Sequence, residues 1–288
     1  MAGNHIQLIT DGTAYVTAER LHELGIISLP IVARASSRTF MYDQQTFEHV
    51  DLLREMNASR CSVEITGPSV EDFRAVFERT LYRTNQMLVM LSSAHLSPIV
   101  ANARAAARDF MGRCDITILD SQTVSVGLGL LVERAGELLQ EGTYPMPEIV
   151  RRVRGMIPRI YVVMVTNTLD YIHRSGRVSA MQAVLGAMLK IHPFIEIEDG
   201  ELIPLEKARR PERALDKLVE FASEFSRVWK LVIFQSGEEP TEDALLLRSR
   251  LEQIVPDREF PIITYDPILA SHIGPEGLGM VIYEGVWR

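Results

Sequence analysis

The chain is poor in the residues that build disulfide or metal frameworks. Only two cysteines, Cys61 and Cys114, occur among 288 residues, and neither belongs to a C-x-x-C or mixed Cys/His motif. A disulfide scaffold and a structural zinc site are therefore not expected. We predict two free thiols, a reducing compartment and no bound metal.

Long apolar runs and an excess of positive charge are lacking as well. No run approaches the roughly 20 apolar residues that cross a bilayer, and the first 25 residues include four charged ones. The 30 Lys and Arg against 38 Asp and Glu give a net charge of −8. Sequence-independent nucleic-acid binding is disfavoured because phosphate contacts need clustered cations. We expect a cytoplasmic protein with no nucleic-acid partner and no stable membrane insertion.

Motifs of nucleotide binding and acyl hydrolysis are missing. There is no P-loop or G-x-G-x-x-G fingerprint, and the glycine-rich loop at 274–279 precedes a predicted strand instead of a helix. There is no G-x-S-x-G elbow either, although Ser93, His272 and Asp120 are candidate members of a triad. A serine-dependent hydrolase or acyltransferase using Ser93 is therefore kept as an alternative, and no cofactor is expected.

What the chain does contain is a repeated alternation of strand and helix patterns. Asp199-Gly200 between two apolar runs predicts a hairpin, and a small-residue connector is expected at 33–39. The alternation predicts an α/β protein of two α/β domains, 1–157 and 158–288, with largely parallel sheets. The two hairpin strands are expected at 194–197 and 202–205. The other expected strands are 6–10, 26–32, 87–91, 116–119, 161–165, 231–234, 262–265 and 280–283, and the expected helices are 17–24, 46–56, 69–81, 98–107, 126–139, 146–156, 212–225 and 241–254.

The stretch 170–193 concentrates several signals. Apolar residues recur at helical spacing over 181–189 and predict one buried helix face. Ser179 and Gln182 fit a capping box at the start of this helix. Arg177 would then place a guanidinium beside free helix N–H groups, an arrangement that suits an anion. An ordinary cap with a solvated arginine fits the same residues.

Hydroxyl and imidazole side chains follow several of the predicted strands and helices. Charge-assisted hydrogen bonds from such groups can hold a carboxylate, and no strong acid/base pair accompanies them. The residues alone therefore favour binding over catalysis. The candidates, all expected in loops, are Thr66, Ser69, Ser92, Ser93, Ser97 and His272, with Arg177 as the cation.

Residues 171–193 resemble the YL-x-x-GGRI-S-x-x-x-x-x-x-G-x-x-L-x-I-x-P signature of bacterial DegV proteins, and the resemblance extends along nearly the whole chain. Each motif is weak alone, but their order and spacing are specific. The other matching segments are Thr10-Asp11-Gly12-Thr13-Ala14 for TDSTA, Asp120-Ser121 for DS, Gly200-Glu201-Leu202-Ile203-Pro204 with Lys207 and Arg209 for G-x-(I/L)-x-P-x-x-K-x-R, and Ser271-His272-Ile273-Gly274-Pro275 for H-T-G-P-G.

The resemblance implies a function as well as a fold. It implies a ligand tunnel between two α/β domains, and a cytoplasmic lipid-binding carrier of phospholipid metabolism that is not itself an enzyme. Such a protein binds one long-chain fatty acid and, in many bacteria, presents its carboxylate to a separate fatty-acid kinase. Ile65 stands where the family has a carboxylate-binding threonine, so Thr66 becomes the candidate from that loop. The implied ligand-binding residues are Thr66, Ser92, Ser93, Ser97, Arg177 and His272.

Basic residues on either side of the predicted hairpin form a weaker signal. A docking surface for an acidic partner such as the kinase and a solvated charged loop both fit this pattern. The residues are Arg174, Lys207, Arg209 and Arg210.

Overall fold

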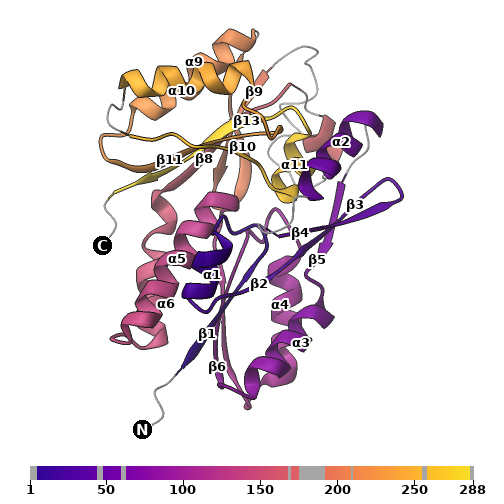
Figure 1. The fold of residues 1–288 in the computed structure, drawn as a ribbon, viewed down its shortest axis with the longest axis vertical. Coiled ribbons are helices and arrows are strands. Elements are labelled where there is room, and N and C mark those ends of the chain that lie inside the picture. The colour runs from indigo at the N-terminus through magenta and orange to yellow at the C-terminus, as the bar shows by residue number, and fades with distance from the viewer. Residues whose placement is uncertain are drawn as a thin grey trace.

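The computed structural model describes residues 5–43, 48–59, 63–167, 170–174, 192–208, 210–254 and 258–285. Figure 1 shows the earlier strands gathered in the lower part of the molecule and the later strands in the upper part, with helices around both. We call these two parts the amino-terminal and carboxy-terminal halves. The architecture is α/β, as the sequence predicts.

A four-stranded parallel sheet forms the centre of the amino-terminal half. Its strand order is β2-β1-β6-β7, and all three neighbouring pairs are parallel. The prediction of a parallel sheet is confirmed here, and the carboxyl ends of β1, β6 and β7 meet at one edge. The strands are β1 Ile6–Asp11, β2 Ile27–Leu29, β6 Gln86–Leu91 and β7 Asp115–Asp120.

The helices of this half begin and end close to the predicted positions. Ser69 caps α3 in a capping box with Asp72. The elements are α1 Ala18–Glu23, α3 Val70–Leu81, α4 Ile99–Ala107, η1 Arg108–Phe110, α5 Ser125–Glu141, α6 Met146–Arg154 and η2 Ile157–Arg159.

A three-stranded antiparallel sheet projects from this half, and the sequence did not predict it. The single strand expected at 26–32 is divided at Pro30, so that β2 joins the parallel sheet while β3 begins the second sheet. The connector expected at 33–39 is wrong, because these residues form most of a β hairpin. The order is β4-β3-β5, with β3 Ile31–Ala35, β4 Arg38–Tyr42 and β5 Val63–Gly67, and α2 Glu48–Ser59 contacts β3 and β4.

A six-stranded mixed sheet forms the carboxy-terminal half, with the order β10-β9-β8-β13-β11-β12. Only the β11/β12 pair is parallel, so the prediction of largely parallel sheets is corrected for this half. The antiparallel direction of β9 and β10 has a local cause, because Asp199 and Gly200 have positive φ angles and form the predicted hairpin turn between them. The strands are β8 Ile160–Val165, β9 His192–Glu198, β10 Glu201–Ala208, β11 Val228–Gln235, β12 Ile262–Thr264 and β13 Leu278–Glu284.

Two groups of helices accompany the mixed sheet. Figure 1 shows α9 and α10 over the top of the sheet, and α11 beside α2 at the junction of the two halves. The helix α11 also contacts α7 and β5. The bounds are α7 Asp170–Arg174, α9 Pro211–Ser223, α10 Glu242–Ile254 and α11 Pro267–Ile273.

The helix α5 connects the two halves. It contacts β1 and β6 of the parallel sheet and β8 and β13 of the mixed sheet, as its central place in Figure 1 suggests. A Cβ at Gly129 would lie 2.4 Å from the Tyr15 carbonyl oxygen, and one at Gly127 would lie 2.9 Å from Ile160. The close packing of α5 therefore depends on glycine at both positions.

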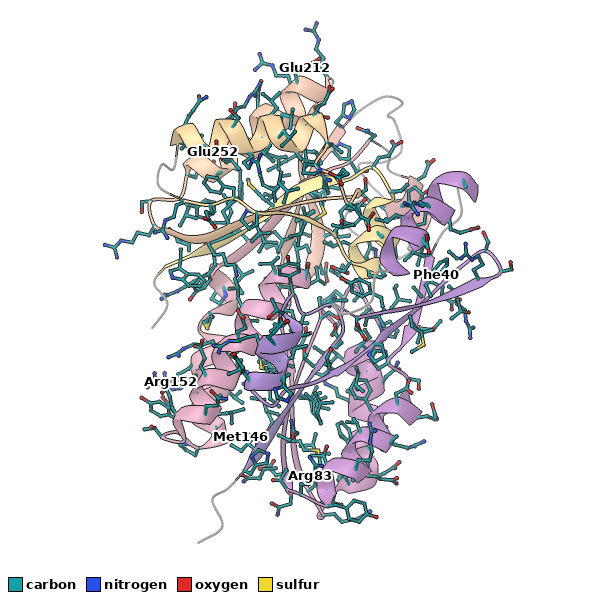
Figure 2. All side chains as sticks on the ribbon, viewed as in Figure 1. Phe40, Arg83, Met146, Arg152, Glu212 and Glu252 are labelled. Carbon is teal, nitrogen blue, oxygen red and sulfur yellow. The ribbon has the colours of Figure 1, made fainter. Side chains whose placement is uncertain are left out.

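The main hydrophobic core runs through both halves. One continuous cluster joins buried residues of the parallel sheet, α5 and the inner face of the mixed sheet, while a second cluster lies beneath α9 and α10. Figure 2 shows side chains filling the space between these layers. The predicted boundary between 157 and 158 falls within η2, and the division into two domains stays a prediction. No described helix has the length and apolar character needed to cross a membrane.

Candidate functional site

The carboxyl end of β1 places Asp11 in a fully buried position beside the end of β6. Its Oδ1 accepts hydrogen bonds from the Thr13 backbone N–H (3.0 Å) and hydroxyl (2.6 Å). Its Oδ2 accepts from the Ser92 backbone N–H (2.7 Å) and hydroxyl (2.8 Å). Burial raises the pKa of Asp11, and these four donors act in the opposite direction by stabilising the carboxylate. Ser92 is thus held in a fixed network.

The next serine connects the two halves of the molecule. The Ser93 hydroxyl donates to the Gly200 carbonyl oxygen in the β9/β10 turn at 2.7 Å, and it accepts from the His95 N–H at 3.2 Å. Gly200 has φ +85°, and a Cβ there would lie 2.6 Å from the Ser93 Oγ. The close approach of this turn therefore depends on a glycine.

The hydroxyls of Thr66 and Ser97, two further predicted ones, differ in their hydrogen bonding. Thr66 lies within β5 and not in a loop, is half-buried, and donates its hydroxyl hydrogen to the Val32 carbonyl oxygen at 3.2 Å. Ser97 is buried in the turn before α4, and its hydroxyl has no hydrogen-bond partner among the residues that the structure describes. Of these two groups, Ser97 has the hydroxyl available to an incoming ligand.

His272 lies in a helix, whereas the sequence predicts a glycine-rich loop at this position. It is buried near the end of α11, and its Nε2 is 3.0 Å from the Leu96 carbonyl oxygen. A carbonyl oxygen only accepts, so Nε2 carries the hydrogen. Leu96 belongs to the same segment as the three predicted serines, so the structure brings His272 against the serine segment.

Asp266 is a buried acid at this junction that the sequence reasoning missed. As the N-cap of α11 it accepts from the N–H groups of Ile268 (2.8 Å) and Leu269 (3.2 Å) through Oδ1. Burial, and secondarily the negative charge of Asp11, raise the pKa of Asp266 to about 7. An aspartate followed by Pro267 and an apolar run is a helix-start pattern, so the sequence does carry a signal for this helix.

Tyr42 brings the three-stranded sheet to the same place. It lies buried at the end of β4. Burial raises the pKa of Tyr42 well above its usual range, and Asp266, Tyr15, Asp43 and Asp11 add to the effect. Asp11, Tyr42 and Asp266 are therefore buried close enough for their charges to influence one another, and we call these three residues the acidic cluster.

The contacts of Asp120 bear on the alternative of a serine hydrolase. Its Oδ1 accepts from the backbone N–H groups of Ala94 (3.2 Å) and Gln122 (3.0 Å), which stabilises the turns after β6 and β7. The Ser93 hydroxyl is donated to Gly200, so neither contact is that of an activated nucleophile or of a group orienting a histidine. These contacts give no support to a nucleophilic Ser93.

Several predicted residues fall outside the described structure. These are Arg177 and Arg209, together with the side chains of Arg174 and Lys207 and the capped helix expected after Ser179; Arg210 is exposed at the start of α9. Cys61 is likewise outside the described residues, and Cys114 is a free thiol. Among the described side chains, no group of three or more His, Cys, Asp and Glu is arranged to hold a metal ion.

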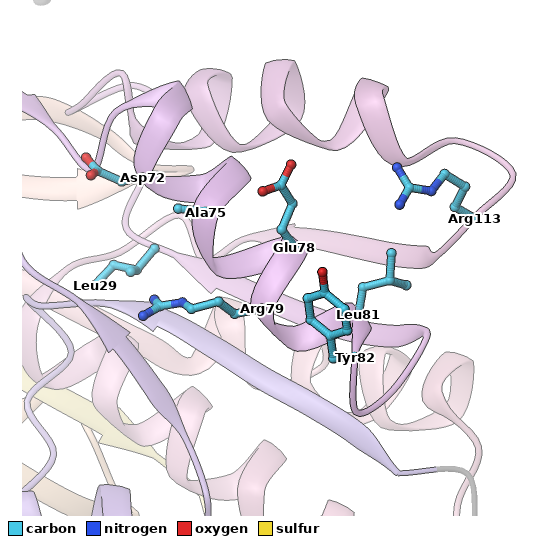
Figure 3. Close-up of a pocket in the computed structure, with 8 residues that line it drawn as sticks. All are labelled: Leu29, Asp72, Ala75, Glu78, Arg79, Leu81, Tyr82 and Arg113. Atoms are coloured by element: carbon cyan, nitrogen blue, oxygen red, sulfur yellow. The ribbon is translucent and has the colours of Figure 1, made fainter.

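Two pockets lie apart from the acidic cluster. A cavity of about 680 Å³ lies against α3, and none of the predicted site residues lines it. Figure 3 shows its lining residues, among them Glu78, Arg79, Tyr82 and Arg113. A second pocket of about 660 Å³ lies between β7 and the strands β8 and β9, with both apolar and acidic lining residues. The predicted ligand tunnel stays a prediction.

Comparison with known proteins gives the family. Residues 5–285 match the family model described as an uncharacterised protein, DegV family. The chain belongs to the DegV family. A DegV domain-containing protein of Deinococcus radiodurans is 27% identical over 283 residues, which cover 96% of this chain and 98% of that protein.

Solved DegV structures share the fold over nearly the whole chain. The structure described as "Fatty Acid Binding of a DegV family Protein from Thermus thermophilus" has a TM-score of 0.82 and 25% identity, covering 98% of this chain and 100% of that chain. A fatty acid binding DegV family protein from Streptococcus agalactiae has a TM-score of 0.85 at 22% identity, covering 98% and 99%. The DegV architecture is therefore that of the whole chain and not of a part.

Proposed function

We propose that this DegV protein binds one long-chain fatty acid. Its carboxyl group would lie beside the serine segment and α11, and its acyl chain in an apolar tunnel between the halves. The observation that carries the proposal is the junction itself, where buried Ser92, Ser93 and Ser97 come together with His272. Such a set orients a head group without transforming it, so the protein acts as a carrier and not as an enzyme.

The energetics of an acyl ligand agree with a site of modest polarity. Burying about 16 carbons at roughly 0.8 kcal/mol per methylene gives on the order of 12 kcal/mol before ordering costs. The polar contacts then need only to orient the head group. The Thermus thermophilus relative, which is described as a fatty-acid-binding protein, supports the same ligand class.

The finer parts of the proposal concern individual residues and a partner. The acyl ligand is the only bound small molecule in the proposal, which includes no cofactor, and the partner is a separate fatty-acid kinase that receives the presented carboxyl group. The head-group residues would be Thr66, Ser92, Ser93, Ser97, Arg177 and His272, and the docking residues Arg174, Lys207, Arg209 and Arg210.

Native mass spectrometry of protein purified under mild conditions tests the proposal. We expect one fatty acid per chain, identified after extraction. Ser97→Ala should weaken retention by about tenfold because it removes one hydrogen bond to the head group. Ser223→Ala is the matched control, because Ser223 is exposed at the end of α9 and should leave retention unchanged. Protein that is empty and takes up no fatty acid on addition contradicts the proposal.

A further inference from the structure

We infer that the turn between β9 and β10 is a positioning element of the acyl site that responds to the bound fatty acid. The ligand carboxylate takes the Ser93 hydroxyl hydrogen from the Gly200 carbonyl oxygen, and the turn then loosens. The mobility of the turn therefore differs between the loaded and the unloaded protein. The inference rests on the proposed acyl-binding function and adds a conformational consequence to it.

The first support is that the Ser93 hydroxyl has a single hydrogen. This hydroxyl donates to the Gly200 carbonyl oxygen at 2.7 Å, and its oxygen accepts from the His95 backbone N–H at 3.2 Å. Carboxylate and carbonyl oxygens only accept, so a full hydrogen bond from Ser93 to the ligand and one to Gly200 exclude each other. When Ser93 binds a carboxylate, the turn therefore loses this contact with the amino-terminal half.

The second support is the difference between Ser93 and its neighbour Ser92. The Ser92 hydroxyl donates to a carboxylate oxygen of Asp11 at 2.8 Å, and the Ser92 backbone N–H donates to the same oxygen at 2.7 Å. The partner of Ser93 is a neutral carbonyl oxygen, and hydrogen bonds to an ionised acceptor are roughly twice as strong as those to a neutral one. A ligand carboxylate therefore competes well for the Ser93 hydrogen and poorly for the Ser92 hydrogen.

The third support is that the backbone holds Ser93 on both sides, whereas the turn lies at an edge. The Ser93 N–H donates to the Thr123 carbonyl oxygen at 2.9 Å, and the Ser93 carbonyl oxygen accepts from the N–H groups of Leu96 (3.1 Å) and Ser97 (3.2 Å). The turn ends a hairpin whose second strand, β10, is the edge strand of the mixed sheet. Gly200 is buried, and a buried acceptor without a donor is unfavourable, so the turn shifts until water reaches this carbonyl oxygen.

A second contact between the same segments is weaker. The Nδ1 of His95 lies 3.0 Å from the Oε1 of Glu201, and these side chains are 50% and 42% exposed. Exposed pairs of this kind contribute little to stability because water and salt screen them. The Ser93 hydrogen bond is buried, so its loss governs the mobility of the turn.

Amide hydrogen exchange followed by mass spectrometry tests the inference, with delipidated protein compared to protein saturated with palmitate at pH 8. Ligand binding normally slows exchange because it stabilises the folded state. We expect the opposite in residues 198–203, where exchange should become about tenfold faster, corresponding to the loss of about one hydrogen bond. Unchanged or slower exchange in the turn of palmitate-bound protein overturns the inference and leaves the acyl-binding function standing. A protein that binds no palmitate removes the proposed function itself.

Two serine variants identify the contact responsible. Ser93→Ala removes the donor, so exchange in the turn should be fast without palmitate and should not rise further with it. Ser97→Ala is the matched control, because Ser97 lies in the same segment and its hydroxyl has no hydrogen-bond partner among the described residues. Its turn should respond to saturating palmitate as the wild-type turn does. A Ser93→Ala turn that exchanges as slowly as the wild-type turn overturns the inference, and the wild-type comparison remains decisive if this variant does not fold.

Discussion

Asp266 shows how much one buried side chain can influence this protein. It serves as a helix cap, which favours the charged form, and it is buried near Asp11, which favours the protonated form. The outcome is a carboxyl group whose pKa of about 7 lies far above the value of 3.8 expected for an unburied aspartate. Its protonation state therefore changes near neutral pH.

The pH dependence of stability checks this balance. Between about pH 4 and 7 the unfolded chain has lost the Asp266 proton while the folded protein retains it, so the stability contributed by this group falls as pH rises through that window and is constant above it. As pH rises across this range, the free energy of unfolding of Asp266→Asn should therefore increase relative to that of the wild type by about 1.4 kcal/mol per pH unit. Urea unfolding at several pH values measures the difference. A difference that does not change with pH contradicts the prediction.

The contact between Ser93 and Gly200 gives a second prediction at the residue scale. Gly200→Ala places a Cβ 2.6 Å from the Ser93 Oγ at a residue with φ +85°, whereas Gly112 has φ +78° and no atom within 4 Å of an added Cβ. Gly112→Ala should therefore lower the free energy of unfolding only by the cost of a side chain at positive φ, about 1 kcal/mol. Gly200→Ala should lower it by about 2 kcal/mol more. Chemical denaturation measures both.

A double-mutant cycle tests whether the contact with Ser93 causes the extra loss of stability in Gly200→Ala. Ser93→Ala removes the atom that the new Cβ would meet, so Ser93→Ala combined with Gly200→Ala should cost less than the sum of the two single changes. Strictly additive effects would show that the loss of stability in Gly200→Ala does not come from the contact with Ser93.

At the scale of elements, the glycines of α5 set how closely this helix packs against the rest of the amino-terminal half. Its glycines differ in what surrounds them: a Cβ at Gly129 would lie 2.4 Å from the Tyr15 carbonyl oxygen, and one at Gly136 would first meet the Leu24 side chain at 3.0 Å. The backbone cannot move aside as a leucine methyl can. Gly129 is therefore a packing requirement, while Gly136 is closer to a tolerated helix glycine.

Alanine at these two positions tests the distinction within one helix. Alanine gains roughly 1 kcal/mol of helix propensity over glycine at either site. Gly129→Ala should nevertheless lower the free energy of unfolding by about 2 kcal/mol or more, and Gly136→Ala should change it by less than about 1 kcal/mol. Thermal and chemical unfolding of both variants measure the difference, and equal effects would show that the Tyr15 contact is unimportant.

At the scale of the whole molecule, the shared core joins the two halves energetically. The main hydrophobic cluster includes residues of both large sheets, and α5 packs against each of them. We therefore expect calorimetry of the full chain to show a single cooperative transition in spite of the predicted division at 157. Two resolved transitions would indicate that each half is stable by itself.

The sequence predicted most of the local structure. The helix at 69–81, the Asp199-Gly200 turn and the strand at 87–91 depend on residues close together in the chain, and all three are found. His272 contacts the Leu96 carbonyl oxygen of the segment that carries the predicted serines, and the assignment of these residues to a ligand site stays a prediction.

Only the tertiary structure decided how distant segments face one another. No pattern in residues 26–32 shows that Pro30 separates strands of different sheets, and no local signal sets β13 antiparallel between β8 and β11. The proximity of Asp11 and Asp266 arises in the same way, because folding brings together residues that lie far apart in the sequence. Local patterns reflect interactions over a few residues, whereas burial, strand direction and charge proximity depend on how the complete chain packs.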